Sequence, residues 1–247
     1  MSEDSLDATP VVMSGVSIGN PTNRDGSNRM NAIVVSDMHI GSRFFMDAVF
    51  ERFLRNVPDD FELILNGDVV DNLYTRLSPS HQQVLDRIQR ISLQQRVVWV
   101  RGNHDNGYVP HDFGNVTFKK THHLEQRLFI AHGDYFDEIM PRNRAFMKAF
   151  RLLHNLRVRL GARPVHVAEY AKTWKFLYRC LRENVMLNAV NYARKKGYQA
   201  VTCGHTHYAE DRAVSGIRYI NTGAWTELPV YYLRVNGNEM TLNSISQ

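Results

Sequence analysis

The chain is organised around the stretch Thr202-Cys203-Gly204-His205-Thr206-His207, which places two histidines two residues apart beside a glycine. The stretch follows the apolar run 199–201, so we interpret it as the end of a buried strand that opens into a loop. Such a loop can present both imidazoles to metal ions. A single histidine pair is weak evidence, and its meaning depends on whether earlier loops supply further ligands.

Length and composition indicate one large α/β domain. The chain has 247 residues, enough to bury a substantial core. No apolar run approaches the roughly 20 residues that a membrane span needs. The N-terminus lacks the charged start and apolar core of a secretory signal, so we expect the protein in the cytoplasm. Its only cysteines, Cys180 and Cys203, predict no disulfide framework and fit a reducing compartment.

The charge is distributed unevenly. The formal net charge is +5, but residues 139–196 hold fourteen Lys or Arg against two acids, a balance of +12 that leaves −7 for the remainder. A basic segment on an acidic body points to an anionic partner.

The first half of the chain repeats one unit, a strand that ends in polar residues. After a tail at 1–29 whose composition predicts flexibility, apolar strands are expected at 32–35, 61–65 and 96–100. Helical spacing predicts helices over 45–54 and 80–93. A strand over 127–131 continues the pattern, and a weaker strand-like run lies at 116–118.

The second half begins with a long helical stretch. Apolar spacing predicts helices between about 140 and 196, interrupted by Gly161-Ala162-Arg163-Pro164 and ended by Gly197. Strands are expected at 217–220, 230–235 and 240–242, the last two joined by a hairpin turn at Asn236-Gly237.

Five loops that follow these strands carry side chains of the types that bind metal ions in proteins. They are Asp37 and His39, Asp68 and Asp71, Asn103 and His104, His132, and His205 and His207. Loops at the strand ends of one sheet converge. Carboxylate, amide and imidazole donors suit a pair of divalent cations that share one carboxylate.

The ordered motifs DxH, GDxxD, GNHD, HG and GHTH resemble the calcineurin-like metallophosphoesterase family, over about 33–207. The resemblance implies an α/β fold, a four-layer α/β/β/α sandwich, for a metallophosphoesterase domain at 30–247 with a helical insertion at about 139–197. It implies a metal-dependent hydrolase of phosphoesters or diphosphates.

The resemblance also implies roles for individual residues. One metal ion would be held by Asp37, His39 and His207. The second would be held by Asn103, His132 and His205, with Asp68 bridging both. His104 would contact the phosphoryl group or protonate the leaving oxygen, oriented by Asp71. Arg43 and Asn72, which flank motifs, are candidates for contact with the substrate phosphate. We interpret the remaining histidines as solvated or capping residues: His81, His111, His122, His123, His154 and His166.

The basic insertion lies between two expected ligands, so we expect it beside the site as a lid. Its Lys and Arg could hold a diphosphate or a membrane headgroup. An ordinary helical pair with a solvated basic face is the alternative. Side chains that could line an apolar groove are Phe146, Phe150, Trp174, Phe176, Leu177 and Tyr178.

With this insertion, the His132-Gly133-Asp134 motif and the strand end at 221–225, the chain resembles the UDP-2,3-diacylglucosamine pyrophosphatase branch of the family. That branch implies hydrolysis of a UDP-linked acylated sugar to UMP and a lipid monophosphate, at the inner membrane surface and with manganese; iron or zinc also fit the donors. The best-studied members of the branch have Arg where this sequence has His104, a departure that fits a divergent relative with a different substrate. A nuclease or general phosphodiesterase, a nucleotide or phosphoprotein phosphatase, and a metal-free scaffold stay open as alternatives.

Overall fold

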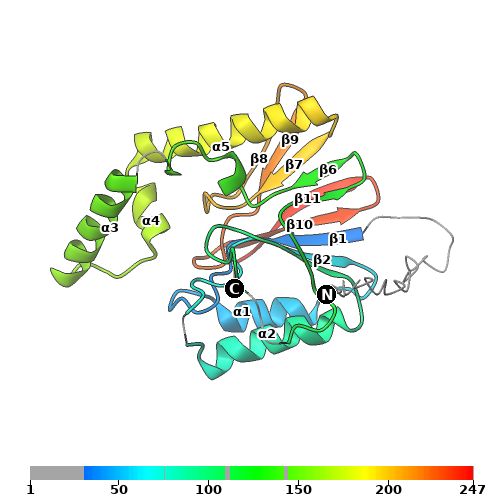
Figure 1. The fold of residues 1–247 in the computed structure, drawn as a ribbon, viewed down its shortest axis with the longest axis horizontal. Coiled ribbons are helices and arrows are strands. Elements are labelled where there is room, and N and C mark those ends of the chain that lie inside the picture. Colours follow the sequence, from blue (N-terminus) through cyan, green and yellow to red (C-terminus); the bar gives the residue numbers. More distant parts are fainter. Residues whose placement is uncertain (1–30, 75, 109–111, 142–143, 247) are drawn as a thin grey trace, which may run out of the picture.

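The computed structural model describes residues 31–74, 76–108, 112–141 and 144–246, without the side chains of 144–147. Two sheets face one another, and helices cover their outer surfaces (Figure 1). The expected tail at 1–29 lies outside the described residues.

The larger sheet has six strands in the order β11-β10-β1-β2-β3-β4. Strands β1, β2, β3 and β4 run parallel, while β10 pairs with β1 and β11 in antiparallel register. Helices α1 (Asp47–Arg55) and α2 (Pro79–Ser92) cover its outer face. The strands are β1 (Asn31–Val35), β2 (Glu62–Asn66), β3 (Val97–Val100), β4 (Thr117–Lys119), β10 (Val230–Asn236) and β11 (Glu239–Ile245).

The smaller sheet has five strands in the order β5-β6-β7-β9-β8. Its central strands β6, β7 and β9 are parallel. Helix α5 (Lys175–Lys196) packs on its outer face. The strands are β5 (His122–Leu124), β6 (Leu128–Ile130), β7 (Ala200–Cys203), β8 (Glu210–Val214) and β9 (Ile217–Asn221).

Alternation along β1 explains why four layers form. Ala32 and Val34 point into the core between the sheets, whereas Ile33 and Val35 pack against α1 and α2. Successive residues of a strand point to opposite faces, so an apolar run such as this one must be covered on both sides. A third core lies between the smaller sheet and α5. The expected four-layer α/β/β/α arrangement is confirmed.

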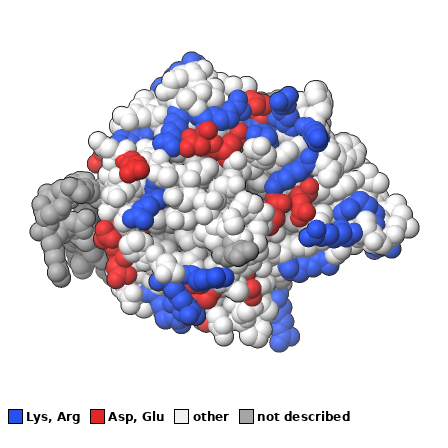
Figure 2. Space-filling model, turned by 180° about the vertical axis from the view of Figure 1, so that it is seen from behind, with Lys and Arg blue, Asp and Glu red and all other residues white. Residues whose placement is uncertain are grey.

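The insertion expected at about 139–197 folds into α3 (Arg144–Arg159), α4 (Val167–Lys172) and α5. Figure 1 shows α3 and α4 projecting beyond the sandwich. We call residues 139–178 the lid. Lys and Arg gather on this projecting end (right-hand side of Figure 2), as the charge count indicates. No helix in the described part of the chain is long and apolar enough to cross a bilayer.

Besides the short 3-10 helix η1 (Asp134–Phe136), three elements were not expected from the sequence. Strand β5 has only three residues, two of them histidines. Strand β8 is an edge strand with charged, exposed residues, which keep such edges from pairing with other chains but hide the strand from hydropathy. Helix α4 has six residues and no buried one, so it leaves no apolar period. The expected helix end at Gly197 is confirmed, with φ of 78°.

Trp225 joins the sandwich to the loop after β1. Its ring is fully buried against Phe50 and Phe53, and its backbone N–H donates to the carbonyl of Asp37 at 3.0 Å. We expect Trp225→Ala to lower the free energy of unfolding by about 3–5 kcal/mol, because it leaves a large cavity. Urea denaturation followed by circular dichroism measures this, with Tyr74→Ala, an exposed aromatic, as the control. A loss below about 1 kcal/mol would contradict the assigned packing.

Candidate metal centre

The loops after β1, β2, β3, β6 and β7 meet where the two sheets adjoin. Main-chain bonds continue the parallel pairing past the strand ends: the N–H of Asp37 donates to the carbonyl of Gly67 at 3.0 Å, and that of His39 to Asp68 at 2.9 Å. In the smaller sheet the N–H of Gly204 donates to the carbonyl of His132 at 2.7 Å. The loops are therefore held in register before any side chain is considered.

Backbone strain is concentrated in these loops. Seven described non-glycine residues have positive φ, and five of them are Asp37, His39, Asp68, His205 and His207, with φ between 50° and 66°. Non-glycine residues rarely adopt this conformation, and it persists where surrounding bonds enforce it. Strain of this kind clusters at functional sites.

Two motif glycines let the loops approach closely. A Cβ atom on Gly102 would overlap the carboxylate of Asp68, and one on Gly204 would overlap the carboxylate of Asp37 and the side chain of Ser36. Only glycine fits where a backbone passes this near a buried acid.

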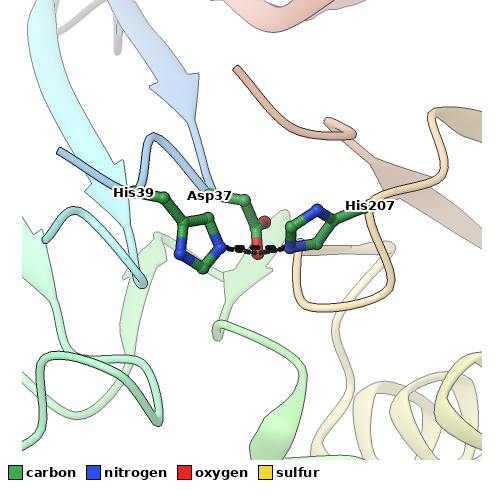
Figure 3. A group of neighbouring side chains, drawn as sticks. All are labelled: Asp37, His39 and His207. Carbon is green, nitrogen blue, oxygen red and sulfur yellow. Dashed lines mark hydrogen bonds and ion pairs between the residues drawn. The ribbon is translucent and has the colours of Figure 1, made fainter. Parts of the chain in front are cut away.

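The first group of side chains is Asp37, His39 and His207 (Figure 3). The Nε2 atom of His207 lies 3.1 Å from Nε2 of His39 and 3.2 Å from Oδ1 of Asp37. All three residues are buried, and they come from the loops after β1 and β7. Two imidazole nitrogens and a carboxylate oxygen that lie this close together are donors suited to one divalent cation.

The second group is Asp68, His132 and His205. Nε2 of His132 lies 3.1 Å from Oδ2 of Asp68, and the same oxygen lies 3.9 Å from Nε2 of His39. Asp68 thus stands between the two groups, where a shared carboxylate is expected. Its other oxygen accepts the backbone N–H of His104 at 2.8 Å.

The second nitrogen of three imidazoles is occupied, which orients each ring. Nδ1 of His39 pairs with the carboxylate of Asp71 at 2.9 Å, and Nδ1 of His132 donates to the carbonyl of Asn66 at 2.9 Å. Nε2 of His205 pairs with Oδ2 of Asp137 at 2.8 Å. Histidines that bind metals use this arrangement, which turns the remaining lone pair toward the ion. Nε2 of His132 is buried, makes no hydrogen bond and faces the carboxylate of Asp68 at 3.1 Å, so the two donors fit a divalent cation placed against both.

Burial and charge oppose one another in the titration of these groups. Burial raises the pKa of Asp37 and Asp68, but nearby imidazoles outweigh it, and both carboxyls have lowered pKa values. Burial lowers the pKa of His39, but its bond to Asp71 and the charge of Asp68 raise it above the ordinary value. The pKa of His132 is raised well above its ordinary value, because the charges of Asp68 and Asp37 outweigh burial.

His104 and Asp71 lie next to one another, as the sequence predicts, but their contact differs from expectation. Nδ1–H of His104 donates to the backbone carbonyl of Asp71 at 2.7 Å, whereas the Asp71 carboxylate lies 3.9 Å away and bonds His39. The backbone of Asp71 orients His104, and its carboxylate orients a proposed ligand.

A cavity of about 360 Å³ opens on both groups. Asn103 also lines the cavity and is exposed, and its role as a metal ligand stays a prediction. Arg43 and Asn72 are not among the lining residues: Arg43 lies over the ring of Phe44, and Asn72 accepts the N–H of Tyr74. Their contact with substrate stays a prediction.

Three residues that bear on the site were missed by sequence reasoning. Asp137 orients His205, and buried Asp105 accepts N–H bonds from Val69, Gly102 and the Trp99 ring. The interpretation of His166 as a solvated or capping residue is incomplete: it caps α4, but its ring also lies 5.0 Å from that of His39. Asp105 and Asp137 lie within or just after motifs, whereas His166 has no local sequence signal.

One known protein family matches most of the chain. The family described as Calcineurin-like phosphoesterase matches residues 30–209. The chain belongs to this family. Membership indicates a metal-dependent phosphoester hydrolase, and members bind divalent metals. No curated protein sequence matches the chain.

Several solved structures are similar at low identity. The chain is 18% identical to the phosphoesterase Yfce from E. coli, with 88% of this chain and 99% of that chain covered and a TM-score of 0.43. It is 15% identical to the Pseudomonas putida nuclease MPE, with 86% and 87% covered and a TM-score of 0.41. It is 13% identical to Vacuolar Protein Sorting 29 from Cryptosporidium parvum, with 88% and 100% covered and a TM-score of 0.45. Similarity at this level does not bear on the substrate.

The raised pKa values of His39 and His132 predict proton release on metal binding. Both imidazoles hold protons to higher pH than usual, and a cation must displace them. We expect affinity for Mn²⁺ to rise from about pH 6 to about pH 8, with about one to two protons released per chain near neutral pH. Calorimetry in buffers of different ionisation enthalpy counts the protons. His132→Gln should release fewer protons than the wild type, and the exposed His123→Gln should release as many. A binding enthalpy that is the same in every buffer would contradict the prediction.

Proposed function

We propose that this protein is a dinuclear-metal hydrolase of a diphosphate that joins a nucleoside monophosphate to an acylated sugar, as in UDP-2,3-diacylglucosamine. The products would be UMP and a lipid-linked sugar 1-phosphate. One observation carries the proposal: the cavity at the metal groups continues without interruption into an apolar chamber beneath the lid.

The chamber has the composition that an acyl chain requires. One end of the cavity is lined by His39, Asp68 and the GHTH loop, the other by side chains of the lid and α5. The latter are mainly apolar: Ile139, Met140, Phe150, Val167, Ala171, Trp174, Leu177, Tyr178 and Leu181. Burying a methylene group in such a chamber contributes about 0.8 kcal/mol, so even part of an acyl chain contributes considerable binding free energy.

Aromatic side chains pack against one another on the inner face of the lid. Phe150 is buried and stacks on Tyr170 at 5.1 Å between ring centroids, with Trp174 at 5.4 Å. Of the expected groove residues, Phe150, Trp174, Leu177 and Tyr178 line the cavity. Phe176 does not, being 82% exposed, and the side chain of Phe146 lies outside the described residues.

The catalytic chemistry follows from the donor groups. Two divalent cations held by these groups would supply Lewis-acid charge at the phosphoryl oxygens and a water of lowered pKa. His104 donates Nδ1–H to the Asp71 carbonyl, so Nε2 is the nitrogen that can transfer a proton to the leaving oxygen. Asp71 and Asp137 hold His39 and His205 in the orientation that metal binding would require. Manganese is our proposed metal, and iron and zinc suit the same ligands.

Two alternatives use the same centre. A nuclease or general phosphodiesterase would use the basic lid to hold a nucleic-acid backbone, and a nucleotide phosphatase would need no chamber. A metal-free scaffold would not need the intact set of donors. The apolar chamber favours the acylated substrate over all three.

A panel of substrates tests the proposal. In Mn²⁺ we expect kcat/KM for UDP-diacylglucosamine to exceed that for the unacylated UDP-sugar by about 100-fold or more, because the chamber binds only the former. Bis-p-nitrophenyl phosphate should be hydrolysed slowly, and Asp68→Ala should hydrolyse none of these while keeping its circular dichroism spectrum. Equal rates of hydrolysis for the acylated and the unacylated UDP-sugar would contradict acyl-chain binding in the chamber. Preferential cleavage of single-stranded DNA would support the nuclease instead.

Neighbouring lid residues provide a matched pair for this experiment. Leu177 lines the chamber, while Phe176 faces solvent. Leu177→Arg should lower kcat/KM for the acylated substrate and leave the hydrolysis rate of bis-p-nitrophenyl phosphate unchanged. Phe176→Arg should change neither rate.

The outer face of the lid fits an anionic membrane surface. Leu152 and Leu156 on α3 and Leu160, just after its end, follow one another at helical spacing and are 69%, 49% and 79% exposed. Exposed basic residues Lys148 and Arg159 flank this ridge. An amphipathic helix with leucines between basic residues binds the interface of bilayers that contain anionic lipid. Peripheral contact with the inner membrane is therefore part of the proposal.

Vesicle sedimentation tests this contact. We expect the protein to pellet with vesicles that contain phosphatidylglycerol, and Leu152/Leu156/Leu160→Gln to weaken partitioning by about tenfold or more, since three leucines leave the interface. The control carries Leu93→Gln and Leu187→Gln, exposed leucines outside the lid. Equal partitioning of both variants would show that the ridge is not the contact surface.

A further inference from the structure

The lid contributes one imidazole to the reaction centre. His166 lies between α3 and α4, and its ring stacks on that of His207 at 5.2 Å with an angle of 14° between planes. It lies 5.0 Å from the ring of His39, and one of its ring nitrogens is within 4.8 Å of donor atoms of His39 and Asp71. His166 also lines the cavity.

The bonding of His166 fixes which nitrogen carries its hydrogen. Nδ1 accepts the backbone N–H of Ala168 at 3.3 Å, so the hydrogen of the neutral ring is on Nε2. A ring in this state has no free lone pair for a metal ion and one N–H to donate. His166 therefore differs from the imidazoles around it.

We propose that His166 is a substrate contact, whose Nε2–H donates a hydrogen bond to a non-bridging oxygen of the phosphoryl group bound at the metal centre. This inference rests on the proposed function and extends it. The phosphoryl oxygens would then be held by the sandwich on one side and by the lid on the other.

The position of His166 in the lid links the two ends of the cavity. Val167, Ala168 and Ala171, which follow His166, line the chamber. An acyl chain in the chamber contacts the same short helix that His166 caps. Substrate binding in the chamber therefore holds the phosphoryl contact in place, so that remote binding free energy serves the reacting group.

Two substitutions separate this role from helix capping. In His166→Ser the hydroxyl still accepts the Ala168 N–H but cannot reach the centre, whereas in His166→Gln the side-chain amide reaches about as far as Nε2. Inorganic phosphate is the probe, titrated by calorimetry into Mn²⁺-loaded protein. We expect His166→Ser to weaken phosphate binding about tenfold or more, because a hydrogen bond to a charged group is lost, and His166→Gln to keep most of the affinity. Bound metal, measured by elemental analysis, should be unchanged in both.

Each contrary outcome overturns the inference. Unchanged phosphate affinity in His166→Ser, or no phosphate binding by the wild type, would show that His166 makes no phosphoryl contact. A lower metal content would make it a ligand. If only His166→Gln weakened phosphate binding, His166 would act as a helix cap and not as a phosphate contact. The exposed His123→Ser is the matched control. If phosphate binding depends on His166 while acylated and unacylated UDP-sugars are hydrolysed equally, the substrate proposal fails and this inference stands.

Discussion

Two carboxylates with almost no contact with solvent, those of Asp37 and Asp68, determine much of the structure around them. An ionised carboxylate that leaves water must recover its solvation from donors and opposite charge. The backbone N–H groups of His205 and His104 supply part of this, and the imidazoles of His132 and His207 supply more. Because the acids end adjacent parallel strands, every loop that partners them must reach the same corner of the sandwich. The left-handed residues and the motif glycines are consequences of that crowding.

The lid is part of the same construction. Its insertion between His132 and His205 means that α5 must return the chain to the site, and Tyr178 donates its hydroxyl to the carbonyl of Thr206 at 2.5 Å within the GHTH loop. Asn188 of α5 bonds the carbonyl of Phe136, just after the loop that carries His132. One helix therefore covers the smaller sheet, supports two metal loops and carries the wall of the chamber. In the proposed function, substrate selection and metal binding would share this support, although they would use different side chains.

The division of charge follows from this arrangement. The sandwich buries the carboxylates of Asp37, Asp68 and Asp105 at its centre. The lid carries Lys and Arg on its exposed face (Figure 2). The field of the lid favours anionic ligands near the mouth of the cavity, and the buried acids favour cations within it. A phosphorylated ligand bound to metal ions would suit both the basic lid and the buried acids.

The sequence by itself determined the strands that precede each loop and predicted the donor residues that follow them, and the family resemblance implied the four layers. Those features are local, since an apolar run with a polar end is a property of adjacent residues such as Ile33 to His39. Only the tertiary structure decided which groups orient them. Asp137 meets His205 across 68 residues, and the Asp71 carboxylate turned out to face His39, 32 residues away, rather than His104. The presence of His166 in the centre depends on how α4 folds back over the GHTH loop. Contacts between distant segments leave no period or spacing in the sequence, because they arise only when separate elements pack.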